Sequence, residues 1–171
     1  MSSSLAHRRI VVTRSEPDNG PLATAIRHTG AEALVVPLVG INPVAASDRD
    51  AMLKSLGDFD WIAFTSANGA RMFCARLDVD QRTAFRVHRG IAAVGPATAR
   101  AVAEAGATSS LTAPVFVAES LADAIGEVRG KSILWPRAAG ARPVLADMLR
   151  ERGAEVVEQI LYDTVAVAIS L

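Results

Sequence analysis

Residues 61–77 read WIAFTSANGARMFCARL and contain one complete unit of the fold that the sequence predicts. The short apolar run Trp61–Thr65 is typical of a buried parallel strand. A turn of small, hydroxyl-bearing residues follows, and Ala67–Leu77 then has the spacing of a helix that turns Phe73 and Leu77 toward the core. The segment therefore predicts a strand, a tight turn and a helix in succession.

The same alternation continues on both sides of this segment. Further strands are expected at Ile10–Thr13, Leu34–Leu38, Ile91–Val94, Ser132–Trp135 and Val156–Leu161. Further helices are expected at Pro21–Thr29, Pro96–Ala105, Val117–Val128 and Pro143–Arg152. Most of these helices begin with Pro or end at Gly, as helices often do. Strands and helices that alternate with short loops predict an α/β fold, in which helices flank parallel sheets.

The chain also contains an internal repeat. Val11–Leu38 aligns without a gap with Leu134–Leu161, so that Gly153 lies 123 residues after Gly30. The aligned identities include two arginine pairs, Arg14 with Arg137 and Arg27 with Arg150, and the Gly-Ala-Glu that follows each helix. The alignment predicts two equivalent βαβ units, one at each end of the chain. The alternative is that the match reflects only the glycine stop and following strand common to βαβ units.

Composition excludes several classes of partner. The 171 residues carry 18 basic and 18 acidic side chains, a formal net charge of zero, so no overall basic field attracts nucleic acid or an anionic membrane. Mean hydropathy is positive at +0.26, but no apolar run approaches the ~20 residues of a spanning helix. The apolar stretch near the N-terminus is too short for a signal-peptide core. These features predict a soluble cytoplasmic protein.

Metal and thiol chemistry are not expected. A single cysteine, Cys74, excludes an internal disulfide and a cysteine metal cluster, and it is interpreted as a small apolar residue on a helix face. The histidines His7, His28 and His88 lack metal-ligand spacing, and we expect His28 and His88 to be solvated.

Two turns between a strand and a helix carry the strongest binding signals. They are Phe64-Thr65-Ser66-Ala67-Asn68-Gly69 and Val94-Gly95-Pro96-Ala97-Thr98-Ala99. Such turns meet at the carboxyl edge of a parallel sheet, where amide N–H groups and hydroxyls favour anions. The alternative is that these residues only cap helices. Because the P-loop, dinucleotide glycine, phospho-acceptor and nucleophile-elbow patterns are missing, we expect an anionic ligand that is bound without metal or nucleotide.

These residues are similar to those of the uroporphyrinogen-III synthase family. The matching segments, in the order of the family, are Val11-Val12-Thr13-Arg14, Gly30-Ala31-Glu32 with Pro37, Asp60-Trp61, the two turns given above, Pro136-Arg137, Gly153-Ala154-Glu155 and Tyr162-Asp163-Thr164. Together these segments cover nearly the whole chain. The resemblance implies two parallel-sheet lobes that are joined by two linkers.

On the family pattern, residues 9–38 are the βαβ half of lobe one, residues 46–162 are a flavodoxin-like lobe two, and residues 163–171 start the return linker. The linkers are expected near Val39–Ala46 and Asp163–Ala168. A family member would continue beyond this chain with roughly another third of its length, so the chain looks truncated and lobe one looks incomplete. We expect that unit to be partly disordered, packed against another copy, or completed by a missing segment.

The resemblance also implies a function. The family acts in haem biosynthesis as a cyclising hydro-lyase, which closes the linear tetrapyrrole hydroxymethylbilane into uroporphyrinogen III with inversion of the last pyrrole ring and without a cofactor. Substrate-binding residues implied in this chain are Thr13, Arg14, Thr65, Ser66, Asn68, Gly95, Thr98 and Arg137. Tyr162 is the implied proton donor.

Alternatives stay open at this point for single residues and for the whole chain. Tyr162 can be an interfacial tyrosine, and Arg14 and Arg137 can cap strand ends or pair with acids. The chain as a whole can be a non-catalytic anion-binding module. It can also be a fragment that pairs with another chain.

Overall fold

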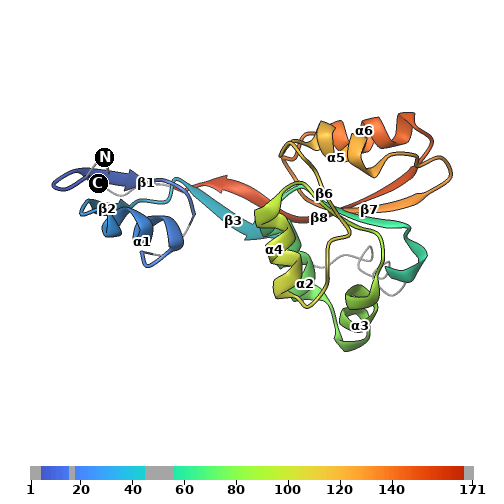
Figure 1. Ribbon diagram of the computed structural model, residues 1–171, viewed down its shortest axis with the longest axis horizontal. Coiled ribbons are helices and arrows are strands. Elements are labelled where there is room, and N and C mark those ends of the chain that lie inside the picture. The colour runs from blue at the N-terminus through green and yellow to red at the C-terminus, as the bar shows by residue number, and fades with distance from the viewer. Residues whose placement is uncertain (1–4, 16–17, 45–55, 168–171) are drawn as a thin grey trace. The chain divides into compact units, whose positions relative to one another are not determined.

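The computed structural model describes residues 5–15, 18–44 and 56–167 (Figure 1). The chain divides into two compact units, one made of Met1–Asn42 with Asp163–Leu171 and the other of Pro43–Tyr162. Ala46, where lobe two was expected to begin, lies outside the described residues. The mixed α/β class predicted from the alternating pattern is confirmed, since both units contain parallel strands and helices.

The first unit is a short βαβ element. It consists of β1 (Arg9–Val12), α1 (Pro21–His28) and β2 (Glu32–Val35), and the two strands pair in parallel. Pro21 opens α1, and Gly30 follows it with a φ of +83°, a left-handed conformation that favours glycine. The described core of this unit contains small residues: Val12, Ala23, Ala31 and Ala33.

Two strands occupy the segments that were expected to be linkers. β3 (Val39–Pro43) pairs with β8 (Glu155–Ala166). The Val167 amide donates to the Leu38 carbonyl at 3.0 Å, and the Val44 amide donates to the Leu161 carbonyl at 2.9 Å. Because the residue numbers rise along β3 while those of their partners fall along β8, the two strands are antiparallel. Residues 163–166, predicted to start the return linker, thus belong to a paired strand.

The second unit contains a parallel sheet in the order β8, β7, β4, β5, β6, with β3 beside β8. The remaining strands are β4 (Trp61–Phe64), β5 (Ile91–Ala93), β6 (Leu111–Thr112) and β7 (Ser132–Ala138). The helices are α2 (Ala67–Arg76), α3 (Val79–Val87), α4 (Pro96–Glu104), α5 (Ala118–Ile125) and α6 (Val144–Glu151). The pair α2 and α4 lies on one face of the sheet, and α5 and α6 lie on the other (Figure 1).

The strand order amends the flavodoxin-like arrangement that was expected. In chain order from β4, the five parallel strands lie 3-2-1-4-5. Numbered instead from β7, they lie 2-1-3-4-5, which is the flavodoxin-like order. The second unit is thus a circular permutation of that arrangement. Either numbering puts the reversal of strand order between β4 and β7.

The internal repeat is confirmed by the register of the strands. Arg9 pairs with Glu32 in the first unit, and Ser132 pairs with Glu155 in the second, each 123 positions later. The helix-end arginines also match: Arg27 Nη2 donates to the Ala33 carbonyl at 3.1 Å, and Arg150 Nη2 donates to the Val156 carbonyl at 2.8 Å. Gly30 and Gly153 have φ values of +83° and +87°. The shared sequence therefore builds the same strand–helix–strand geometry twice.

One helix was not predicted from the sequence. The segment of α3 is mostly polar and buries Phe85 alone among its residues. Phe85 packs edge-on against Phe64 and Phe73. The available signal was a capping box, in which Asp78 and Gln81 bond each other's backbone amides.

The solvated position expected for His88 is wrong, although His28 is exposed as expected. His88 is half-buried, and its Nδ1 accepts the Gly90 amide at 3.2 Å while Nε2 lies 2.9 Å from the Phe59 carbonyl. Because Nδ1 accepts, Nε2 carries the hydrogen. His88 therefore ties the end of α3 to the loop before β4. Cys74 is buried on α2, as predicted.

None of the helices in the described ranges is long and apolar enough to cross a membrane.

Candidate functional site

The candidate site lies where the carboxyl ends of β4 and β7 meet. The helix after β4 is α2 and the helix after β7 is α6, and these two helices lie on opposite faces of the sheet. Open α/β sheets bind ligands in the crevice that such a reversal creates. The turn with Thr65 and Ser66 directly follows β4, and Trp135 and Arg137 lie on β7. Four chemistry-bearing residues thus converge at one edge.

Ser66 and Tyr162 form the first polar contact of the site. Ser66 is the N-cap of α2, where its Oγ accepts the Gly69 amide at 2.9 Å. The same Oγ lies 3.1 Å from the Tyr162 hydroxyl. Tyr162 is 6% exposed and lies at a register shift, because Arg137 pairs with Ile160 whereas Ala138 pairs with Tyr162. A bulge of this kind redirects a side chain.

Thr65 and Trp135 form the second contact. The indole Nε1–H of Trp135 donates to Thr65 Oγ1 at 3.2 Å, which joins the turn after β4 to β7. Trp135 is 1% exposed and belongs to the core cluster between the sheet and α5 and α6. The contact therefore holds the Thr65 hydroxyl against the buried core.

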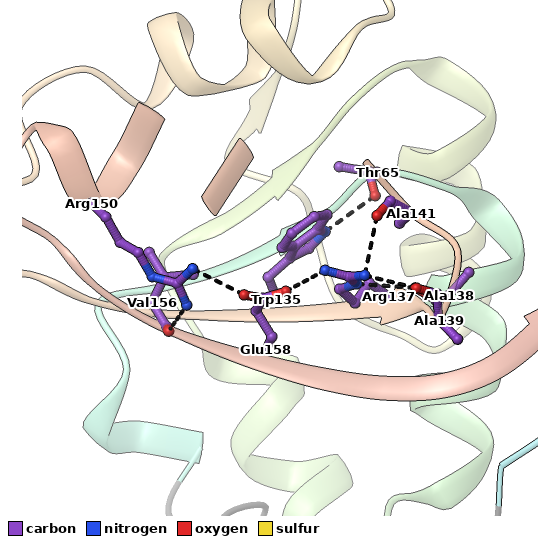
Figure 2. Close-up of polar contacts among 9 residues, drawn as sticks. All are labelled: Thr65, Trp135, Arg137, Ala138, Ala139, Ala141, Arg150, Val156 and Glu158. Atoms are coloured by element: carbon purple, nitrogen blue, oxygen red, sulfur yellow. Dashed lines mark hydrogen bonds and ion pairs between the residues drawn. The ribbon is translucent and has the colours of Figure 1, made fainter. Parts of the chain in front are cut away.

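Arg137 is occupied by internal partners. Its guanidinium lies 4.9 Å from the centre of the Trp135 ring and forms an ion pair with Glu158 (Figure 2). It also donates to the carbonyls of Ala138 at 3.0 Å, Ala139 at 2.8 Å and Ala141 at 3.1 Å. Glu158 in turn contacts Arg150 at 3.0 Å. The arrangement supports a structural role for Arg137 in the loop that follows β7.

A pocket of about 220 Å³ opens at this edge. Its walls are Thr65, Val94, Phe116, Val117, Ala118, Trp135, Ala141 and Arg142. Phe116 is 65% exposed and lies over Gly95, where a Cβ atom would approach the ring to 2.9 Å. Gly95 therefore makes room for an aromatic wall. Arg142 contributes a cation, which contacts Glu119 at 3.4 Å.

The other predicted site residues differ in their surroundings. Asn68 is exposed in the first turn of α2, whereas Thr98 is 3% exposed within α4. Thr13 and Arg14 belong to the first unit, where they directly follow β1 and are exposed. The second unit thus brings Ser66 to Tyr162 and joins Thr65 to Arg137 through Trp135.

Sequence reasoning missed four residues of this site: Trp135, Phe116, Arg142 and Glu158. Glu158 carried a usable signal, because a carboxylate inside a mostly apolar strand needs a buried partner. The basic residue expected to face the ligand, Arg137, is that partner. Phe116 carried no periodic signal, since its role depends on the backbone at Gly95.

Comparison with known proteins identifies the family. Residues 20–170 match the family model described as uroporphyrinogen-III synthase HemD. The uroporphyrinogen-III synthase of Synechococcus elongatus is 32% identical over 163 residues, which are 94% of this chain and 62% of that protein. The chain thus spans less than two thirds of this relative.

Solved structures share the fold. A mutant uroporphyrinogen III synthase from Thermus thermophilus superposes with a TM-score of 0.66 at 19% identity, covering 94% of this chain and 64% of that one. The enzyme from Helicobacter pylori gives 0.61 at 16% identity, with 96% and 65% covered. Both likenesses concern the fold alone. Because the family model matches most of this chain, the chain belongs to the uroporphyrinogen-III synthase HemD family.

Proposed function

We propose that the chain acts as a uroporphyrinogen-III synthase, a cyclising hydro-lyase of haem biosynthesis in the cytoplasm that converts hydroxymethylbilane into uroporphyrinogen III. The observation that carries the proposal is the contact of Ser66 with Tyr162 at the strand-order reversal of a chain from this family. It joins a hydroxyl-rich turn to the single tyrosine of the sequence.

Binding is proposed to rely on neutral donors and a few arginines. The substrate carries eight carboxylates, whereas the chain has no net positive charge. The N-terminal turns of α2 and α4 present amide groups toward anions, and hydroxyls add further donors. We keep Thr13, Arg14, Thr65, Ser66, Asn68, Gly95 and Thr98 as proposed substrate-binding residues. For Arg137, the internal contacts favour a positioning role.

Tyr162 is proposed to donate a proton to the departing hydroxyl of the substrate. The C–O bond breaks, the hydroxyl leaves as water, and an electrophilic azafulvenium cation remains. Ser66 Oγ already accepts the Gly69 amide, so its own hydrogen can point to the Tyr162 oxygen. Ser66 would then stabilise the phenolate that forms. The proton that the last pyrrole loses after rearrangement restores Tyr162.

Ring inversion follows from how the substrate is held. The substituted position of the last pyrrole attacks this cation, which forms a spiro intermediate that rearranges. Without a protein, the flexible chain closes to the symmetric isomer I. A site that fixes the reacting rings favours the spiro path by proximity and orientation. These steps consist of proton transfer and carbon–carbon bond rearrangement, so the proposal includes no cofactor.

The test is an isomer-resolved assay with hydroxymethylbilane. Wild-type protein is expected to form isomer III, and Tyr162→Phe is expected to lower kcat by about 100-fold, as loss of a general acid does. Thermal unfolding of both proteins controls for folding. If wild type forms only isomer I but binds the tetrapyrrole, the chain is an anion-binding module instead. If Tyr162→Phe keeps the wild-type rate, Tyr162 is not the acid.

Self-association through the first unit stays a hypothesis. Val11 and Leu38 are exposed large apolar residues of this unit, so it presents surface that another copy can cover. Size-exclusion chromatography with light scattering tests it. A monomer at all concentrations contradicts it.

A further inference from the structure

The Trp135–Thr65 contact sets the direction of the Thr65 hydroxyl. An indole N–H is a donor only, so Thr65 Oγ1 accepts in this hydrogen bond of 3.2 Å. The hydrogen of Thr65 must then point to a different acceptor. Because Thr65 lines the pocket of about 220 Å³, that hydrogen can be directed into the pocket. Trp135 thereby leaves the Thr65 hydrogen free to be donated to a group in the pocket.

Arg137 keeps both the indole and the next wall of the pocket in place. Its guanidinium lies over the Trp135 ring, and it binds the three carbonyls of Ala138, Ala139 and Ala141 (Figure 2). Ala141 itself lines the pocket. Glu158 and Arg150 complete the network from the opposite side of Arg137, which fixes the guanidinium plane.

We propose that Trp135 and Arg137 are positioning residues that make Thr65 a hydrogen-bond donor to a carboxylate in this pocket. The inference rests on the proposed function, since the ligand is one pyrrole ring of the tetrapyrrole with its acidic side chains. Phe116 supplies an exposed aromatic face for the ring. Arg142 supplies the cation that lines the pocket, with Glu119 as its partner at 3.4 Å. A directed hydroxyl adds specificity for a carboxylate oxygen without adding charge.

The probe is a monopyrrole that carries one acetate and one propionate side chain, and its dissociation constant is measured by calorimetry. Thr65→Val removes the hydroxyl at nearly constant volume and is expected to weaken binding about tenfold, the effect of one lost hydrogen bond to a charged group. Thr65→Ser is expected to restore it. The methyl ester of the probe accepts only a neutral hydrogen bond, so Thr65→Val is expected to weaken its binding less than that of the acid.

A double-mutant cycle separates positioning from packing. Trp135→Phe keeps the ring but removes the N–H, and it is expected to weaken acid binding by a similar factor. Trp135→Phe combined with Thr65→Val is expected to lose no more than Thr65→Val alone, because both act through one hydroxyl. The matched control is Trp61→Phe, at the one other tryptophan of the sequence, which lies outside the pocket. It is expected to leave the affinity unchanged.

A spectroscopic measurement keeps the test valid if Trp135→Phe does not fold. Two indole N–H signals are expected in a ¹⁵N correlation spectrum, one for each tryptophan. Thr65→Val is expected to move the Trp135 signal upfield, and the acidic probe is expected to move it in wild type without moving that of Trp61.

The outcomes separate this inference from the proposed function. If wild type binds the probe but makes no isomer III, the proposed function fails and the inference stands. If wild type makes isomer III while Thr65→Val keeps full affinity and KM, the inference fails alone. Fully additive losses in the cycle, or a wild type that does not bind the acid, also overturn it.

Discussion

The hydroxyls of Ser66 and Tyr162 lie 3.1 Å apart, although 96 positions separate the two residues in the sequence. Ser66 starts α2, and Tyr162 lies on β8 next to the register shift in its pairing with β7. The contact therefore connects a helix start on one side of the strand-order reversal with a strand on the other side. Both residues were expected to belong to the site, and the structure joins them directly.

Ser66→Ala removes both a helix cap and the partner of Tyr162. We expect a loss of about 1–2 kcal/mol in the free energy of unfolding, measured by urea denaturation, since a lost cap alone costs about 1 kcal/mol. The matched control is Asn68→Ala, at an exposed position two residues further along the same helix. It is expected to change stability by less than about 0.5 kcal/mol. Equal effects of the two changes contradict the role of Ser66.

Acid is expected to weaken the link between β4 and β7 through Asp60. The Lys131 ammonium and then the Ser132 amide hydrogen-bond this carboxylate and hold its pKa below the ordinary value of 3.8. Because the folded pKa is lowered, the stabilisation is present above the unfolded pKa and is lost as pH falls through the folded value. The free energy of unfolding in urea is measured for wild type and Asp60→Asn at pH 7 and at pH 3 or below. At pH 7, Asp60→Asn is expected to be less stable than wild type. The difference in free energy of unfolding between the two proteins is expected to narrow in acid. A difference that does not change with pH contradicts the stabilising role of the Asp60 carboxylate.

The repeat provides a pair of equivalent leucines that differ in burial. Leu145 on α6 is 0% exposed, whereas its equivalent Leu22 on α1 is 41% exposed. Leu145→Ala is expected to cost about 2–5 kcal/mol by leaving a cavity, and Leu22→Ala less than half of that. Native-state hydrogen exchange of β7 and β8 measures the first, and exchange of β1 and β2 measures the second. Equal losses of stability would mean that the Leu22 side chain is buried in solution.

Cys74 is expected to be nearly inert toward alkylation. Burial raises the pKa of this thiol from 9.0 to about 11, so at pH 8 the folded protein has about a hundredfold less thiolate than the unfolded chain. Iodoacetamide is therefore expected to react about a hundredfold more slowly with native protein than in urea. Because the folded pKa is raised, the neutral thiol favours folding, and this contribution declines as pH rises above 9.0. A native rate within tenfold of that in urea contradicts the burial.

Several features could be predicted because they depend on local chemistry. Gly30 and Gly153 end their helices with positive φ values, and Ser66 caps α2 through an amide three residues away. The apolar runs at β4 and β7 pointed to buried strands for the same reason. The helix α3 was missed because Phe85 alone is buried in it, so its polar residues show no periodic apolar face.

The amino-acid sequence by itself determined the α/β class, the repeated strand–helix–strand unit and the family, because these depend on periodicity, helix ends and ordered motifs. Only the tertiary structure decided the circularly permuted strand order, the meeting of Ser66 with Tyr162, and the internal partners of Arg137. The physical reason is that a polar side chain is directed by whichever donor or acceptor the sheet brings within about 3 Å of it. Glu158, which lies 21 positions from Arg137 in sequence, reaches it only because β8 pairs with β7.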